Sequence, residues 1–395
     1  MNARRLLAAA ALAPVVKAVV GGSRFTLSAA SSRRRNGQMS SGVPTPEPSV
    51  GLAAAVAVDE LFTMPMGLLA SVFADAHYER SSAELDEAVR YYDEHGWLES
   101  SADYFLDPTT PVMSLPQPGA GGVEVATFES AWEPRSGEVG RDRWSQWDEN
   151  SEVPVTLLRH PGRPRPWLVA LHGQGMGSRA DARMLRMRKV HERLGINVAL
   201  PVLPLHGTRR AGMAADRQFV SNVYPVNNVL GLSQATWDVR RVLRWLRDEE
   251  AAPRVGVLGF SLGSYVCSLL ATIEVDLDCA IAVVPSADLA GALRAAEPLH
   301  PRKRQLHRQV HDWRSTLIHQ VVSPIARPCL VASERRFIVA GQGDQVARPA
   351  GAALLAEHWG PACVTWRPRG HLTTGASSAY DSLLLSLLEQ SGLAV

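Results

Sequence analysis

The segment Val255-Gly-Val-Leu-Gly-Phe-Ser-Leu-Gly-Ser-Tyr-Val-Cys-Ser-Leu-Leu-Ala271 decides the fold of this chain. A short apolar run ends at Gly259, Ser261 lies midway between Gly259 and Gly263, and a helical pattern of small and apolar residues follows. We therefore expect a strand, a tight turn and a helix. A side chain presented at such a turn requires a strained backbone, and the flanking glycines remove the side chains that would collide there.

The composition is that of an ordinary globular protein. Of 395 residues, 46% are hydrophobic and 20% are charged. The net charge of +2 hides an asymmetry, because residues 1–38 contain seven basic residues and no acid, which leaves −5 for the remainder. A mildly acidic body argues against nucleic-acid binding. The four cysteines are widely spaced, which argues against a zinc site or a disulfide framework and favours buried free thiols: Cys267, Cys279, Cys329 and Cys363.

The N-terminal region resembles a tail. Residues 6–20 are apolar, but Pro14 and Lys17 interrupt them, so the run is too short and too broken to span a membrane. Residues 23–35 are rich in serine and arginine, as in export signals and transit peptides. We expect residues 1–49 to be a disordered or targeting tail and linker. The predicted location is the cytoplasm, with membrane association and a targeting segment left as open alternatives.

Residues 50–120 are predicted to form an N-terminal helical extension. One wide apolar stripe follows residue 52, and residues 82–92 have the pattern of an amphipathic helix. The stripe could contact lipid or an acyl chain, but packing against the core is the more common reason for such a pattern.

Residues 121–395 show the pattern of a single α/β domain. Residues 122–130 and 153–159 suit an antiparallel pair of strands at the edge of a larger sheet. After Pro166, strands alternate with helices, which predicts a parallel sheet with right-handed crossovers and helices on both faces. The expected strands are residues 167–171, 196–202, 255–258, 279–284, 336–340 and 363–366.

A long excursion at about residues 286–327 breaks this alternation and is predicted to be a helical lid insertion. It carries a basic cluster, which consists of Arg302, Lys303, Arg304 and Arg308. The cluster is either a solvated helix face or a surface that attracts an anionic part of a substrate.

A serine hydroxyl becomes a useful nucleophile when a base removes its proton and a third group orients that base. Asp344 follows the expected strand 336–340, and His371 follows the last strand. Asp344 could instead cap the next helix, and Asp288, one strand earlier, is the alternative acid. We favour Asp344 as the partner of His371.

Negative charge that develops on a substrate oxygen needs backbone donors aimed at it. The amide of Leu262 and the amide of Gln174, in the glycine-rich loop 172–177, are the expected donors. Within this loop, Gly173 and Gly175 would allow the backbone to approach a substrate closely. His172 is expected to brace the loop, and His206 is expected to line the entrance to the site.

Four motifs together resemble the α/β-hydrolase family over residues 120–395: His172-Gly-Gln-Gly, Gly-Phe-Ser261-Leu-Gly, Gly-Gln-Gly-Asp344 and Gly-His371. The resemblance implies an eight-stranded, mostly parallel sheet in which Ser261 occupies a nucleophile elbow. It also implies a Ser261, His371 and Asp344 catalytic triad.

The resemblance further implies a serine hydrolase that cleaves a small-molecule or lipid ester through an acyl-enzyme, without a metal or organic cofactor. Three groups of alternatives stay open on the same fold: an amidase, peptidase or thioesterase, an acyltransferase, and a catalytically silent binding protein. The predicted partners exclude nucleic acid, peripheral membrane contact stays open, and the oligomeric state is not predicted.

Overall fold

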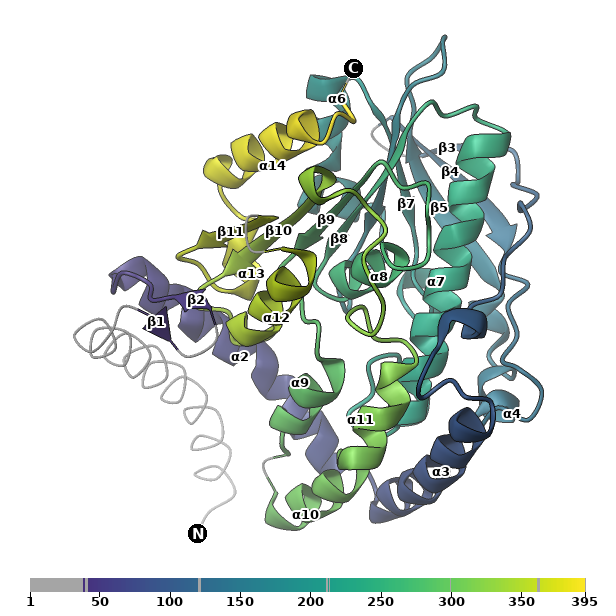
Figure 1. Cartoon of the computed structure of the whole chain (residues 1–395), viewed down its shortest axis with the longest axis vertical. Helices are drawn as coiled ribbons and strands as arrows, with labels where there is room; N and C mark the ends of the chain where they lie inside the picture. The colour runs from purple at the N-terminus through teal and green to yellow at the C-terminus, as the bar shows by residue number, and fades with distance from the viewer. Residues whose placement is uncertain are drawn as a thin grey trace.

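The computed structural model describes residues 38–39, 42–119, 122–210, 212, 214–298, 300–360 and 363–394. Most of the predicted tail, residues 1–37, lies outside this part of the chain. In the described part, a central sheet is covered by helices on both faces (Figure 1).

The central sheet has nine strands in the described residues, in the order β11-β10-β9-β8-β6-β7-β5-β4-β3. Neighbouring strands from β7 through β6 to β11 are parallel, and β3, β4 and β5 add antiparallel pairs at one edge. The strands are β3 (Gln117–Gly119), β4 (Val123–Glu129), β5 (Glu152–Leu158), β6 (Trp167–Leu171), β7 (Asn197–Pro201), β8 (Val255–Phe260), β9 (Cys279–Val283), β10 (Arg336–Gly341) and β11 (Val364–Arg367).

The prediction of eight mostly parallel strands was therefore wrong in the number of strands, and the sheet is mixed. The additional strand is β3, which pairs antiparallel with β4 in a register that places Pro118 opposite Glu124. Proline lacks an N–H group and is tolerated in a strand only at an edge, which is where β3 lies. The predicted antiparallel pair at the sheet edge is confirmed as β4 and β5.

The chain runs from β6 to its neighbour β7 and then crosses back to β8, on the other side of β6. The order of the strands therefore switches between β6 and β8. Helix α6 (Met187–Leu194) leads from β6 to β7 on one face, and helix α7 (Pro225–Asp248) leads from β7 to β8 on the other face. At such a switch point, a crevice opens outside the carboxyl ends of the two strands, and ligands of open α/β sheets bind there.

Two clusters of buried side chains hold helices on the two faces of the sheet. The first contains side chains from α7, α8 (Leu262–Leu270) and α12 (Pro349–Trp359). The second contains side chains from α5 (Asp181–Met184), α6 and α14 (Ser378–Gln390). Because both faces are covered, every residue of β6, β7 and β9 is buried.

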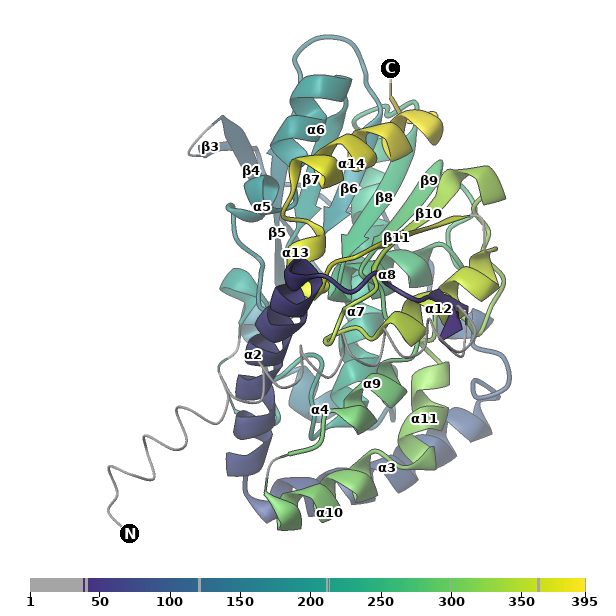
Figure 2. The same cartoon turned by 90° about the vertical axis from the view of Figure 1, so that its left-hand side faces the viewer.

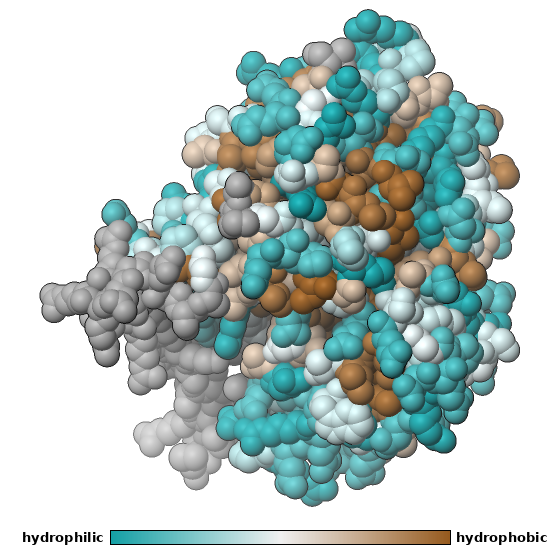
Figure 3. Space-filling model, in the orientation of Figure 1, coloured by the Kyte–Doolittle hydropathy of each residue, from teal (hydrophilic) through white to brown (hydrophobic). Residues whose placement is uncertain are grey.

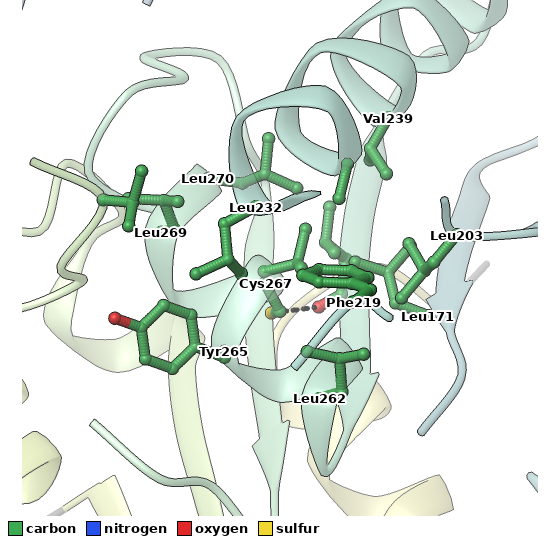
Figure 4. Close-up of a cluster of buried hydrophobic side chains, with 14 of the residues drawn as sticks. Leu171, Leu203, Phe219, Leu232, Val239, Leu262, Tyr265, Cys267, Leu269 and Leu270 are labelled. Atoms are coloured by element: carbon green, nitrogen blue, oxygen red, sulfur yellow. Dashed lines mark hydrogen bonds between the residues drawn. The ribbon is translucent and has the colours of Figure 1, made fainter. Parts of the chain in front are cut away.

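The first cluster surrounds the start of α8 (Figure 4). The ring of Phe219 lies against α7 at Gly231, where a Cβ atom would collide with it. Leu262, the first residue of α8, belongs to the same cluster and is 7% exposed. The residue after Ser261 is thus fixed by the core.

The N-terminal helices are α2 (Val50–Val72) and α3 (Asp75–Glu94), and α3 contributes Tyr78, Leu85, Ala88 and Tyr92 to the first cluster. Helix α3 packs beside α10 (Pro301–Val310) and α11 (Trp313–Gln320), and α9 (Leu289–Ala295) joins them at one end of the molecule (Figures 1 and 2). Helix α2 runs from α13 (His371–Thr374) toward that end (Figure 2). In the described ranges, no helix is both long enough and apolar enough to cross a bilayer.

The remaining elements are short. They are β1 (Gln38–Met39), β2 (Val43–Pro44), η1 (Ala102–Tyr104), α4 (Arg141–Trp144), η2 (Asp148–Asn150), η3 (Gly207–Arg209) and η4 (Ser333–Arg335).

Two residues of the basic cluster join α10 to the start of α3. Arg302 forms an ion pair with Asp75 at 2.6 Å, and Lys303 donates to the same carboxylate and to the carbonyl of Phe73. Arg308 pairs with Glu297 at 2.7 Å. The surface over α10 is strongly hydrophilic (Figure 3). Acids of the chain itself therefore already neutralise part of this positive charge.

Candidate active site

Ser261 lies at a sharp turn between β8 and α8, outside the carboxyl end of β8. Its backbone has φ 55° and ψ −115°, a conformation that is strained for a residue with a side chain. A Cβ atom at Gly259 would collide with the carbonyl of Gly263, and a Cβ atom at Gly263 would collide with the carbonyl of Leu171 at the end of β6. The glycine spacing predicted from the sequence is therefore required by the close approach of the backbone segments.

His371 connects Ser261 to Asp344. The Nε2 atom of His371 lies 2.8 Å from the Ser261 Oγ atom, and its Nδ1 atom lies 2.7 Å from an Asp344 carboxylate oxygen. Asp344 follows β10, and His371 is the first residue of α13, after β11. The structure thus brings together three side chains that the sequence places 83 and 27 residues apart along the chain.

The second carboxylate oxygen of Asp344 is held by its own loop. It accepts hydrogen bonds from the amides of Val346 and Ala347, at 2.9 and 2.8 Å. Because both oxygens are engaged, the carboxylate presents one fixed acceptor to His371. Nδ1 of His371 then donates to Asp344, and Nε2 accepts a proton from Ser261.

The electrostatic environment raises the pKa of His371. Burial by itself would lower the pKa of His371, but the charge and hydrogen bond of Asp344, together with the charge of Asp59, outweigh burial and raise the pKa above its usual range. A charged imidazole that forms after proton transfer from Ser261 is therefore stabilised in place.

The predicted glycine-rich loop lies directly against Ser261. A Cβ atom at Gly173 would be 3.2 Å from the Cβ of Ser261, and Gly175 has a φ of +78° in an exposed turn. Within the part of the chain that the structure describes, the backbone amides of Leu262 and Gln174 have no protein acceptor. Neither amide is therefore committed to an acceptor among the described residues.

Both ring nitrogens of His172 contact backbone groups of this region. Its Nδ1 donates to the Gly173 carbonyl at 2.9 Å, and its Nε2 accepts from the Leu203 amide at 3.0 Å. Burial lowers the pKa of His172 to about 4, so the ring is neutral near pH 7. With both ring nitrogens engaged, His172 is a structural group.

The expectation that His206 lines the entrance was wrong. This side chain is only 4% exposed, and its Nε2 atom lies 3.0 Å from the side-chain oxygen of Gln174. Its ring meets Phe219 edge-on, so apolar packing draws it into the interior. The carboxylate beside His371 is that of Asp344 and not that of Asp288. Asp288 is exposed and caps α9 by accepting from the Gly291 amide at 2.8 Å.

Sequence reasoning missed Asp59, a buried acid of α2. One of its oxygens accepts from the amides of His371 and Gln345, at 2.6 and 3.2 Å, and the other accepts from the amide of Leu372 at 3.2 Å. A signal was present, because Asp59 ends an apolar run and shares one helix face with Leu52 and Val56.

Comparison with known proteins identifies two mycobacterial proteins that are similar to this chain in sequence. These are the proteins named "Uncharacterized protein Rv2627c" (strain H37Rv) and "Uncharacterized protein MT2702" (strain CDC 1551 / Oshkosh) of Mycobacterium tuberculosis. Each is 34% identical over 362 residues, which cover 90% of this chain and 86% of the relative. No family model matches the chain.

Solved structures resemble the chain more weakly. Acetyl xylan esterase 1 from Thermoanaerobacterium sp. is 12% identical, with a TM-score of 0.48 over 76% of this chain and 93% of that chain. TT1662 from Thermus thermophilus is 20% identical, with a TM-score of 0.44 over 60% of this chain and 93% of that chain. Likeness at this level does not extend an activity from those proteins to this chain.

Proposed function

The chain belongs to the same protein family as Rv2627c of Mycobacterium tuberculosis, a relative whose name assigns no activity, and from the site we propose that it is a serine hydrolase of the α/β-hydrolase type that cleaves carboxylic esters. The observation that carries this proposal is the pair of His371 contacts, 2.8 Å to Ser261 and 2.7 Å to Asp344. They lie at the switch point of the sheet, where a ligand crevice is expected.

In the proposed reaction, the Oγ atom of Ser261 forms a bond to the acyl carbon of the ester while Nε2 of His371 accepts the serine proton. The tetrahedral intermediate then expels the alcohol, which takes that proton from His371. Water attacks the resulting acyl-enzyme, again with His371 as base, and releases the carboxylic acid and free Ser261. Asp344 holds the imidazole in the required tautomer throughout.

The negative charge of the intermediate falls on the former carbonyl oxygen. The amides of Leu262 and Gln174 are the proposed donors to this oxygen, since neither has an acceptor among the described residues. Leu262 follows Ser261 in the chain, and Gln174 follows Gly173, which lies against Ser261. Removal of one such donor in other hydrolases costs about 100- to 1,000-fold in rate.

A fluorophosphonate probe tests the nucleophile without knowledge of the substrate. We expect the probe to label the native protein and to fail with Ser261→Ala. The matched control is Ser268→Ala, a serine of α8, the helix that follows Ser261, whose buried hydroxyl donates to the Ser264 carbonyl. It should be labelled like the native protein. Equal labelling of Ser261→Ala would contradict the assignment.

A hydrolysis panel tests the bond type. Esters graded in acyl length and charge should be cleaved, and matched thioesters and amides should be cleaved more slowly at equal concentration. Faster turnover of the thioester or amide series would replace the ester proposal with one of those activities.

A further inference from the structure

We propose that Asp59 of α2 is a positioning residue for the site, whose carboxylate holds the His371 and Asp344 loops together and whose charge stabilises the imidazolium of His371. This inference rests on the proposed hydrolase function. It assigns part of the catalytic arrangement to the N-terminal helical region, far from the other site residues in the sequence.

The carboxylate of Asp59 connects two loops through three backbone amides. It accepts from His371 and Leu372, at the start of α13, and from Gln345, which follows Asp344. Hydrogen bonds to an ionised acceptor are roughly twice as strong as neutral ones. Because the amide of His371 itself is bound, the position of the imidazole depends on Asp59.

The two loops are shaped to receive α2. A Cβ atom at Gly370 would lie 2.6 Å from an Asp59 carboxylate oxygen and 2.8 Å from the carbonyl of Ala55. A Cβ atom at Gly343 would lie 2.7 Å from a methyl carbon of Leu52. Glycine at both positions lets α2 approach the backbone, and Figure 2 shows α2 beside α13. This helix is thus packed into the site.

The charge of Asp59 is placed where positive charge forms. Two carboxylates act on His371, Asp344 at the ring and Asp59 at the backbone, and both raise the pKa of His371. Burial is the main cause that raises the pKa of Asp59 itself, and the Asp344 charge adds to it, while the three amides act in the opposite direction. Among the residues that the structure describes, Asp59 has no ion pair with a basic side chain, and burying a carboxylate without a cation is costly. A functional reason for this acid would account for that cost.

The test measures how fast a fluorophosphonate labels Ser261 between pH 5 and pH 9. In this reaction, the serine oxygen forms a bond to phosphorus, fluoride leaves and His371 takes the proton. We expect Asp59→Asn to lower the rate constant by about 10- to 100-fold, because a displacement of about 1 Å can cost about 100-fold. The acid limb of the pH profile should also move to lower pH. Glu60→Gln, the same charge change one residue along α2, should match the native protein.

Each outcome decides the inference. A native rate and an unmoved acid limb in a folded Asp59→Asn variant would overturn it, and a slower rate with an unmoved limb would overturn the role of the charge. If Asp59→Asn does not fold, Gly370→Ala is the second variant, because its methyl group displaces the carboxylate and leaves every charge in place. A native rate in Gly370→Ala would overturn the inference. Failure of the probe to label the native protein would instead overturn the proposed hydrolase function.

Discussion

Replacing Asp344 with asparagine should abolish most of the activity through a change of tautomer at His371. One oxygen of Asp344 accepts from the Val346 and Ala347 amides. The carbonyl oxygen of an asparagine would keep these two bonds, which turns its NH₂ group toward His371. An NH₂ group donates, so Nδ1 would have to accept, and the proton would move to Nε2. Nε2 then cannot take the proton of Ser261.

The size of the expected loss in rate follows from the loss of His371 as the general base. An imidazole in the wrong tautomer costs about 10,000-fold in serine hydrolysis of this type, which corresponds to about 5 kcal/mol in the barrier. The unfolding temperature of Asp344→Asn should change little, since the loop bonds to Val346 and Ala347 persist. The assay is the initial rate on a chromogenic ester at pH 8, together with fluorophosphonate labelling of Ser261.

The matched control is Asp288→Asn, which alters the exposed cap of α9 and should leave the rate within about twofold, as expected of a surface change away from the site. An Asp344→Asn variant that retains more than about a tenth of the native rate, where a loss of about 10,000-fold is expected, would refute the reasoning from the tautomer.

Three further predictions concern the pKa of His371, the packing at Gly263 and a buried ion pair. Because the pKa of His371 is raised and only neutral imidazole acts as base, kcat/KM should rise with pH through a midpoint above the usual value of about 6.5; a midpoint below 6 would contradict this sign. Gly263→Ala should lower the free energy of unfolding by about 3 kcal/mol in urea, because its methyl group would meet the Leu171 carbonyl. The ion pair of Arg209 with Asp238, at 2.9 Å, is fully buried, so Arg209→Met should cost about 3–5 kcal/mol. Adding Asp238→Leu should recover most of that loss, and failure to recover it would show that packing dominates over charge.

Much of the geometry around Ser261 could be predicted from the sequence because local patterns determine it. Parallel strands end at one edge of a sheet, so the residues that follow each strand meet there. Ser261, Asp344 and His371 each follow a strand, and the structure brings them into contact. The alternation of strands and helices likewise fixed the parallel part of the sheet.

The features that were missed depend on contacts between distant segments. The three-residue strand β3 contains Pro118 and has no alternating pattern, so only its pairing with β4 identifies it. Asp59 lies in an ordinary helical stripe, and its role becomes visible only when α2 meets the loops 286 and 312 residues further along the chain. His206 was misplaced because its burial depends on Phe219, in a loop without periodicity.

The bond between Asp59 and the His371 amide also has a consequence for biosynthesis. It joins positions 312 residues apart, and contacts of such wide separation form late because loop closure must precede them. In a nascent chain, Asp59 of α2 is made 312 residues before His371, so α2 has no partner loop until that later segment has been synthesised. The proposed esterase activity would therefore appear only after His371 has been synthesised and has met α2, and its appearance would report that this contact has formed.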